Sequence, residues 1–264
     1  MRVFALRRKS LRLLVIGISL LVFGGFLTGG PFAGSTETLA GFVTGIKKLH
    51  PIYSVDTKEP KVAISFDASW GAERTPKILD ILDKYKVKTT FFLVNIWLKE
   101  YPDKAQEIVK RGHEIGLHST THPDFKKLSE QQMEKELTAN SEMIYKLTKF
   151  KPILFRPPFG SYNNTVITVA QRLGYHVIQW DVDSLDWKNL SANEIQNRVL
   201  KKVKNGSIVL FHNDGKYTPE ALGPIIAELQ KKGFKIVPVS ELIYQNDYYV
   251  DVNGIQHSSQ APKN

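Results

Sequence analysis

Two histidines four residues apart mark the first candidate for a chemical site. They lie in the segment His118-Ser-Thr-Thr-His122, and a turn of that length lets both imidazole rings converge on one metal ion. Two nearby histidines are often only a surface pair, and the chain contains seven. The metal interpretation gains weight because carboxylates and another histidine follow other apolar segments of the chain.

Four further residues have types that suit acid–base chemistry. Asp67 ends an apolar segment, where burying an unpaired carboxylate would be costly. Arg156 ends another such segment and is a candidate bidentate partner that would keep Asp67 ionised. This pair suits a structural ion pair or a general base. His212, held protonated by Asp186, suits a general acid that protonates a leaving amine.

The elements that must position these residues alternate along the chain. Apolar segments predict strands at 61–68, 89–94, 113–118, 153–158, 175–183, 207–212 and 234–240. Helical patterns lie between them, at 73–86, 102–111, 129–147, 164–173, from about 191, and at 218–232. Ser129 and Gln132 have capping-box spacing at the start of the third helix. This α/β alternation predicts parallel strands with right-handed crossovers, in a barrel or an open sheet.

The polar candidates share one position in this pattern, because each follows the carboxyl end of a predicted strand. They are Asp67, His118, His122, Arg156, Asp183, Asp186 and His212. Random placement would put about half of them at the other strand ends, so the sequence predicts one polar site at one barrel mouth. Trp70, Trp180 and Trp187 lie beside these residues in the sequence and suit stacking against sugar rings, although tryptophan is more common in cores.

Several functional classes are excluded by what the chain lacks. No G-x-G-x-x-G follows the first predicted strand and no P-loop motif occurs, so no nucleotide site is expected. The absence of cysteine excludes disulfides, thiolate zinc sites and cysteine nucleophiles. The net charge is +10, but five basic residues fall within the first twelve positions and the body has no long basic run. Nucleic acid is therefore not an expected partner.

The amino terminus has the pattern of a targeting segment. Basic residues up to Arg12 precede an apolar run with no charge until Glu37. We therefore expect residues 1–35 to be a signal peptide or a signal-anchor helix that associates with the membrane, followed by a spacer at 36–60. The catalytic body is expected at 61–243 and a polar tail at 244–264. These expectations predict an extracytoplasmic protein, either membrane-anchored or secreted.

Five ordered motifs resemble a known family. SFDASWG, HSTTH, RPPFG, DSLDW and LFH are similar in order and spacing to the motifs of the polysaccharide deacetylases, the NodB-homology or carbohydrate esterase 4 family. The resemblance covers about residues 61–242 and implies a single distorted (β/α)7 barrel domain. It also implies a divalent metal cofactor, Zn²⁺ or Co²⁺. The FDASWG form is similar to a sporulation-associated subgroup from Gram-positive bacteria.

The resemblance also implies a role for each matching residue. Asp67 matches the catalytic base and His212 the acid, while His118 and His122 match metal ligands. Arg156 matches the residue that orients the base, and Asp186 matches the residue that tunes the acid. The backbone N–H of Phe159 matches the group that holds the oxyanion, and Trp187 and Leu210 match the apolar residues that enclose the acetyl methyl group. Ala68 departs from the pattern, because the family usually has a second aspartate there as third metal ligand. Asp67, Asn213, Asp214 or water could compensate.

The expected function is hydrolysis of N-acetyl groups on an extracytoplasmic polysaccharide, either peptidoglycan amino sugars or a chitin-like polymer. Two alternatives remain open. Removal of O-acetyl groups would use the same barrel chemistry. Ala68 favours the other alternative, a catalytically weak protein that binds glycan or acts in morphogenesis.

Overall fold

The computed structural model describes residues 47–260. The predicted leader at 1–35 and the first part of the predicted spacer lie outside the described residues. Residues from Lys48 onward form one compact unit. Among the described helices, none is both long enough and apolar enough to cross a bilayer.

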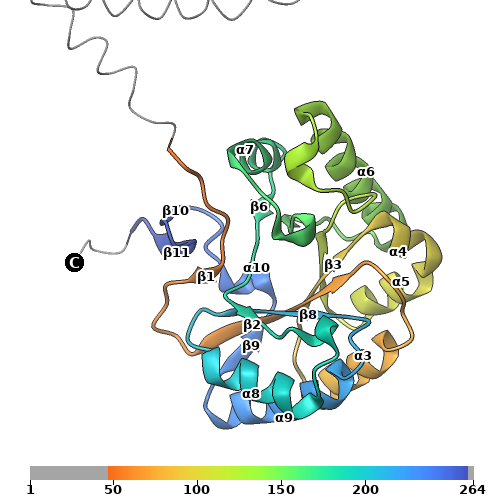
Figure 1. The fold of residues 1–264 in the computed structure, drawn as a ribbon, viewed down its shortest axis with the longest axis vertical. Helices are drawn as coiled ribbons and strands as arrows, with labels where there is room; N and C mark the ends of the chain where they lie inside the picture. Colours follow the sequence, from red (N-terminus) through yellow and green to blue (C-terminus); the bar gives the residue numbers. More distant parts are fainter. Residues whose placement is uncertain (1–46, 261–264) are drawn as a thin grey trace, which may run out of the picture. The chain divides into compact units, whose positions relative to one another are not determined.

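A parallel sheet forms the centre of this unit (Figure 1). Its strands are β2 (Lys61–Ala68), β3 (Thr90–Leu93), β4 (Glu114–Leu117), β5 (Leu154–Phe155), β6 (His176–Val177), β7 (Val182–Asp183), β8 (Ile208–His212) and β9 (Lys235–Val237). The order is β6-β5-β4-β3-β2-β8-β7, with β9 beside the start of β2, and all pairs are parallel. The parallel sheet confirms the prediction of a distorted (β/α)7 barrel, with helices between successive strands except β6 and β7, which residues 178–181 join directly.

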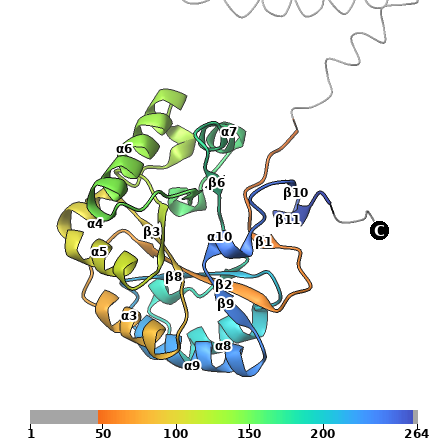
Figure 2. The same cartoon turned by 180° about the vertical axis from the view of Figure 1, so that it is seen from behind.

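Helices cover the outside of this sheet (Figure 2). They are α3 (Thr75–Lys84), α4 (Asn95–Glu100), α5 (Pro102–Lys110), α6 (Glu130–Thr148), α7 (Asn164–Arg172), α8 (Ala192–Lys202) and α9 (Thr218–Lys231). The short helix α10 (Val239–Leu242) instead packs in the interior core through Val239 and Leu242. The short helices η2 (Phe125–Lys127), η3 (Pro158–Gly160) and η4 (Asp186–Lys188) lie in connections. The predicted capping box of Ser129 and Gln132 is confirmed at the start of α6.

Strand β2 shows how the sequence separates core from site. Val62, Ile64 and Phe66 belong to the outer core that packs under the helices. The alternate residues face the barrel interior, where Ala63 joins a second core and Asp67 reaches the pocket. Since side chains of a strand alternate between its two faces, this pattern also directs Ala68 toward the outer core.

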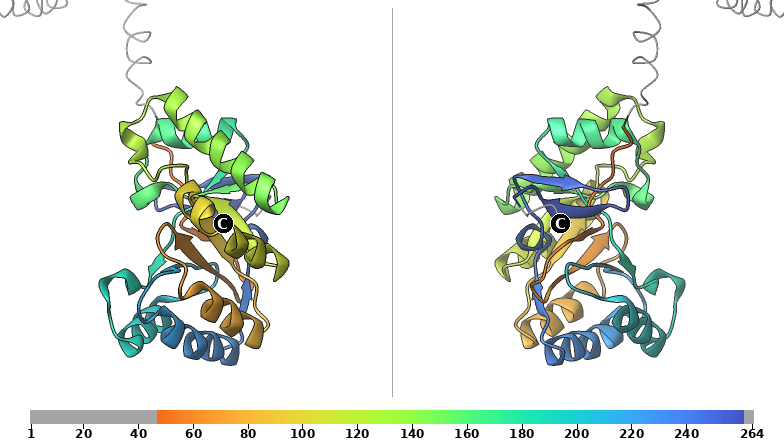
Figure 3. Two further views of the ribbon diagram at one scale, coloured as in Figure 1. Left: turned by 90° about the vertical axis from the view of Figure 1, so that its right-hand side faces the viewer. Right: turned by 90° about the vertical axis from the view of Figure 1, so that its left-hand side faces the viewer.

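Both ends of the described chain close the interior core, which corrects the predicted polar tail. Strands β10 (Tyr248–Val250) and β11 (Ile255–Ser258) form an antiparallel hairpin, and β11 pairs with β1 (Ser54–Val55) in the predicted spacer. Figure 3 shows this hairpin in dark blue. Its apolar residues are spaced among polar ones, and for this reason the sequence pattern predicts a polar tail. Tyr248 and Val250 nevertheless pack against the interior core.

The bounds of two strands in the structure also differ from the predicted ones. The segment 175–183 divides into β6 and β7, because Gln179 between them bonds away from the sheet. Its N–H donates to Ile52 O at 2.7 Å, and its carbonyl accepts from Arg156 Nη2 at 3.1 Å. The last predicted strand, 234–240, stops at Val237 because Pro238 begins helix α10.

Candidate active site

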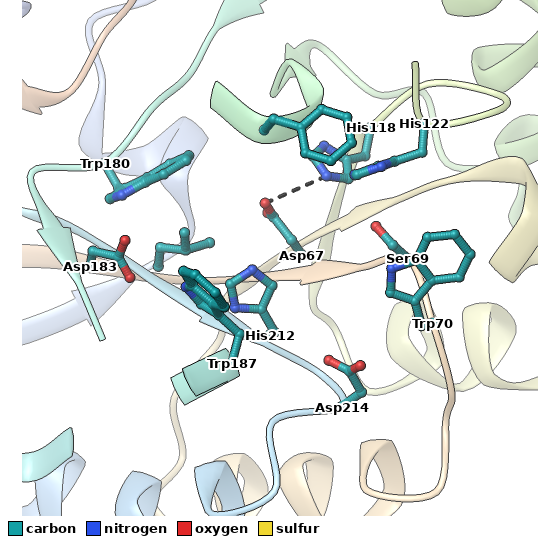
Figure 4. A pocket seen from close by; sticks show the side chains of 12 residues that line it. Asp67, Ser69, Trp70, His118, His122, Trp180, Asp183, Trp187, His212 and Asp214 are labelled. Carbon is teal, nitrogen blue, oxygen red and sulfur yellow. Dashed lines mark ion pairs between the residues drawn. The ribbon is translucent and has the colours of Figure 1, made fainter. Parts of the chain in front are cut away.

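The carboxyl ends of the barrel strands surround one pocket of about 550 Å³ (Figure 4). Its lining consists of Asp67, Ser69, Trp70, His118, His122, Phe159, Trp180, Asp183, Trp187, Leu210, His212 and Asp214. Seven of the nine predicted site residues are in this lining. The other two, Arg156 and Asp186, are fully buried and hydrogen-bond to Asp67 and His212.

Arg156 holds Asp67 in a fixed orientation. Arg156 Nη1 donates to Asp67 Oδ1 at 2.7 Å, while Nη2 donates to Ser65 Oγ at 2.9 Å and to the Gln179 carbonyl. The guanidinium also lies over the Phe92 ring, 4.1 Å from its centroid. Burial acts to raise the pKa of Asp67, but the charge and hydrogen bond of Arg156, together with His118 and His212, outweigh burial and lower this pKa. Asp67 is therefore ionised, with Oδ2 directed toward His118.

The two histidines of the HSTTH segment lie together, as predicted. Their ring centroids are 5.0 Å apart. His118 Nδ1 lies 2.7 Å from the Arg156 carbonyl, which makes Nδ1 the protonated nitrogen and leaves Nε2 facing Asp67 Oδ2 at 3.5 Å. Burial is the main cause that lowers the pKa of His122 to about 4. Both rings are thus neutral and suited by donor type to a divalent transition metal.

Helix α6 holds the backbone of this segment. Asn140 Oδ1 accepts from the backbone N–H groups of His118 and Ser119, at 3.0 and 3.1 Å. Asn140 Nδ2 donates to Leu93 O and Asn95 Oδ1, so its amide makes four hydrogen bonds. One turn earlier, Glu136 accepts from the N–H groups of residues 120 and 121. Asn140 was not predicted from the sequence, because a single polar residue within a helix has no spacing that marks it as a site residue.

A third protein ligand for a metal is lacking. Among residues 47–260, no group of three His, Cys, Asp or Glu side chains is arranged to hold an ion. Ala68 is fully buried in the outer core. Of the proposed substitutes, Asn213 points its amide to Gly71 O and Thr75 Oγ1. Figure 4 shows Asp214 well separated from His118 and His122. The residues present therefore fit an ion held by two imidazoles, with Asp67 Oδ2 as the nearest carboxylate oxygen.

Asp186 and His212 form the second polar pair. Asp186 Oδ1 lies 2.8 Å from His212 Nδ1, and Oδ2 accepts from the His212 backbone N–H at 2.8 Å and from Thr218 Oγ1 at 2.6 Å. Burial of His212 acts to lower its pKa, but the hydrogen bond and charge of Asp186 outweigh burial and raise it. Thr218, at the start of α9, is a positioning residue that the sequence analysis missed.

Aromatic rings form the rim of the pocket. Trp70, Phe159 and Trp187 are each more than half exposed, and His122 makes edge contacts with Phe159 at 4.5 Å and Trp70 at 6.1 Å between centroids. Phe159 has a left-handed backbone with φ of +59°. Leu210, nearly fully buried, lines the pocket from β8. These rings provide flat apolar faces suited to sugar rings.

Comparisons with known proteins agree with this geometry. Residues 54–178 match the family model described as polysaccharide deacetylase. The chain is 36% identical over 206 residues to a peptidoglycan-N-acetylglucosamine deacetylase of Bacillus cereus, covering 75% of this chain and 96% of the relative. The pocket, the barrel and these matches define a carbohydrate-acting hydrolase fold, and the chain belongs to the polysaccharide deacetylase family.

Two further relatives have a similar level of sequence identity. The uncharacterized protein YlxY of Bacillus subtilis is 37% identical over 73% of this chain, which spans 60% of YlxY. The crystal structure of BA3943 from Bacillus anthracis, described as a carbohydrate esterase 4 pseudoenzyme, is 36% identical with a TM-score of 0.71, covering 78% of this chain and 72% of that one. A mutant of BA3943 with restored enzymatic activity matches with the same TM-score and 38% identity over 73% of this chain and 70% of that one.

Proposed function

We propose that the protein hydrolyses N-acetyl groups on peptidoglycan amino sugars. The observation that carries this proposal is the placement of Asp67 and His212 as directly paired positions on β2 and β8. Their surroundings move their pKa values apart, lowering that of Asp67 and raising that of His212. One group is therefore ready to accept a proton beside another that is ready to donate one, as an amide hydrolysis requires.

In the proposed reaction, Asp67 takes a proton from the water that attacks the acetyl carbonyl carbon. The backbone N–H of Phe159 stabilises the oxyanion of the tetrahedral intermediate. His212, whose Nδ1 is held by Asp186, gives a proton from Nε2 to the amine nitrogen as the C–N bond breaks. Acetate and a free amino sugar leave. Trp187 and Leu210 enclose the acetyl methyl group.

A divalent ion bound by His118 and His122 would polarise the acetyl carbonyl and the attacking water. With two protein ligands instead of three, we expect weaker binding than in a three-ligand site. Zn²⁺ and Co²⁺ both suit imidazole donors.

The substrate and location belong to the same proposal. The peptidoglycan deacetylase names of relatives such as the Bacillus cereus enzyme support a wall glycan as the substrate. The basic and apolar pattern of residues 1–35 supports an extracytoplasmic protein that is secreted or anchored in the membrane. The FDASWG motif supports a role in sporulation.

A glycan-binding protein with little catalysis is the second candidate. Ala68 favours it, because the missing carboxylate weakens the metal site. The similarity to BA3943, described as a pseudoenzyme, supports the same alternative.

Acetate release from purified residues 48–260, with peptidoglycan or chitin oligomers and with Zn²⁺ or Co²⁺, tests both candidates. The deacetylase proposal predicts metal-stimulated acetate release together with an equal amount of free amine. Intact glycan binding without acetate release would identify the binder instead. Acetate released without new amines would identify an O-acetyl esterase.

A further inference from the structure

The barrel end opposite the pocket carries a cluster of lysines, called here the basic end. They lie at the amino ends of β2 and β9, or at the carboxyl ends of α8 and α9 and in the adjoining loops. The cluster consists of Lys58, Lys61, Lys201, Lys202, Lys204, Lys231, Lys232 and Lys235, all exposed except the half-buried Lys61.

Contacts between these elements place the lysines side by side. Lys61 and Lys235 are paired positions of β2 and β9. Asn205 Nδ2 donates to Lys58 O and Gly206 N donates to Lys61 O, so the loop after α8 lies on the start of β2. Helices α8 and α9 pack against each other, and in Figure 1 they lie together below β2. Because the helices run opposite to the strands, all eight lysines lie at about the same level of the barrel.

The charge of the molecule is concentrated at this end. Residues 48–260 contain 29 lysines and arginines and 25 aspartates and glutamates. The basic end has eight lysines but only two glutamates in contact with them, Glu59 and Glu228. The rest of the described body therefore carries a small acidic excess, and the pocket contains Asp67, Asp183 and Asp214. The eight lysines thus form a local basic excess on a body that is otherwise slightly acidic.

Few of these lysines pair with a carboxylate within 4 Å, although Glu59 also interacts electrostatically with Lys235, and Asp181 with Lys204. Lys61 pairs with Glu59 at 2.7 Å, and Lys231 and Lys232 are each 3.9 Å from Glu228. Within the described residues, the other five form no salt bridge. Lysines in the last turns of α8 and α9 complement the helix dipoles. That reason does not apply to Lys58, Lys204 and Lys235, which lie outside the helices. Concentrated like charge destabilises a folded protein unless an external anion compensates it.

We propose that the basic end docks on a bilayer surface rich in anionic phospholipid, with the pocket directed away from the membrane. Compact ammonium groups spread at one level match a diffuse layer of phosphate headgroups. The cluster has no arginine for bidentate recognition, and Phe234, which lies between Lys232 and Lys235 in the sequence, is partly buried against the outer core. The lysines thus lack free aromatic rings for stacking on bases, which disfavours nucleic acid. This inference goes beyond the proposed function and does not depend on catalysis.

Vesicle binding by residues 48–260 tests the proposal. This body encloses both cores, and the similar Bacillus cereus deacetylase consists almost entirely of the matched domain, so the body is expected to fold alone. We expect binding to phosphatidylglycerol vesicles, weakened by salt, and no binding to phosphatidylcholine vesicles. The variant K201E/K202E/K204E/K235E should lower the partition coefficient at least about a hundredfold.

The matched control is K99E/K126E/K127E/K216E, which changes the net charge equally at exposed lysines that follow the carboxyl ends of β3, β4 and β8, at the pocket end of the barrel. It should retain most of the binding. Equal loss in both variants would mean that net charge alone attracts the protein, and absence of binding by the wild type would also overturn the proposal. If soluble polyphosphate bound more tightly than the vesicles, and through the same four lysines, the surface would be assigned to a linear polyanion instead.

Tryptophan fluorescence tests the orientation. Trp70, Trp180 and Trp187 line the pocket, and Trp97 Nε1 donates to Gly71 O beneath the same mouth. The chain contains only these four tryptophans. Brominated phosphatidylglycerol should therefore leave their emission unquenched in the docked state. Strong quenching would show that the aromatic rim, and not the basic end, faces the bilayer.

Discussion

In the proposed mechanism, the ion pair between Asp67 and Arg156 is more than a structural contact. Arg156 occupies only Oδ1 of the carboxylate, at 2.7 Å, and Oδ2 remains directed into the pocket beside His118. A purely structural pair would gain more from bidentate contact. The free oxygen is consistent with a base that must accept a proton during turnover.

Asp67→Asn should reduce turnover about a hundredfold to ten-thousandfold, the usual range for a lost general base. It should also destabilise the fold by about 3 kcal/mol, because Arg156 is fully buried and would lose its counterion. Acetate release and denaturant unfolding measure the two effects separately. The control is Asp183→Asn, which neutralises another pocket carboxylate. Unchanged activity in Asp67→Asn would mean that the base is assigned wrongly.

His212 should give the reaction a pH dependence that Asp186 controls. The acid must be protonated, so activity is present below the pKa of His212 and falls as the pH rises through it. Asp186 raises that pKa against the effect of burial. Asp186→Asn should therefore shift the alkaline limb of kcat/KM to lower pH and leave the acidic limb, set by Asp67, in place. An alkaline limb that does not move would contradict the assigned acid.

Ala68→Asp should tighten Zn²⁺ binding only if the new carboxylate can turn from the outer core toward His118 and His122. Ala68 is fully buried, and an unpaired carboxylate there is costly. We therefore expect the variant to be less stable than the wild type without metal and to regain stability with Zn²⁺. Calorimetric titration and thermal unfolding with and without Zn²⁺ measure this. Equal Zn²⁺ affinity in both proteins would show that the site cannot form.

At the scale of elements, helix α6 acts as the support of the histidine segment. Asn140 Oδ1 binds two consecutive backbone N–H groups there, and Glu136 binds the next two. The rings of His118 and His122 are consequently set by a helix that contributes no side chain to the pocket lining.

Asn140→Ala should lower both stability and metal affinity. It leaves the buried N–H of Ser119 without an acceptor and the N–H of His118 with only the longer bond to Leu93 O at 3.3 Å, at a cost of about 2 kcal/mol. Asn140→Asp is the matched control, because it keeps acceptor oxygens for both N–H groups. Thermal unfolding measures the stability of both variants. Zn²⁺ titration should give a higher metal affinity for Asn140→Asp than for Asn140→Ala. Equal metal affinity in the two variants would contradict the support role.

Elements that depend on a local sequence pattern can be predicted from the sequence. Residues whose role depends on a partner far along the chain cannot. Strand β2 matches the predicted bounds because most of its residues are apolar, and the α6 cap follows from Ser129 and Gln132. The meeting of the predicted polar side chains at one pocket follows from the sequence, because the carboxyl ends of parallel strands lie together. Asn140 and Thr218 were missed, since their roles depend on partners 22 and 32 residues away.

At the scale of the whole molecule, the two ends of the described chain complete the barrel. The sheet path ends at β6 and β7, and Ile52 forms bridges with Ile178 beside β6. Val55 donates to Gly206 O, and β11 then pairs with β1. The five family motifs all lie between these ends, so the motif region is smaller than the folding unit.

Residues 48–260 should therefore unfold in one cooperative transition, whereas residues 61–243 should not. The shorter chain loses Ile52 and Val55 from the interior core, together with the contacts of Tyr248 and Val250. Fully burying one such aliphatic side chain contributes about 1.5 to 3 kcal/mol, so the loss is comparable to the whole stability of a domain. Circular dichroism and binding of an apolar dye measure the difference. A cooperative transition of the shorter chain at the same temperature would show that the motif region closes its own core.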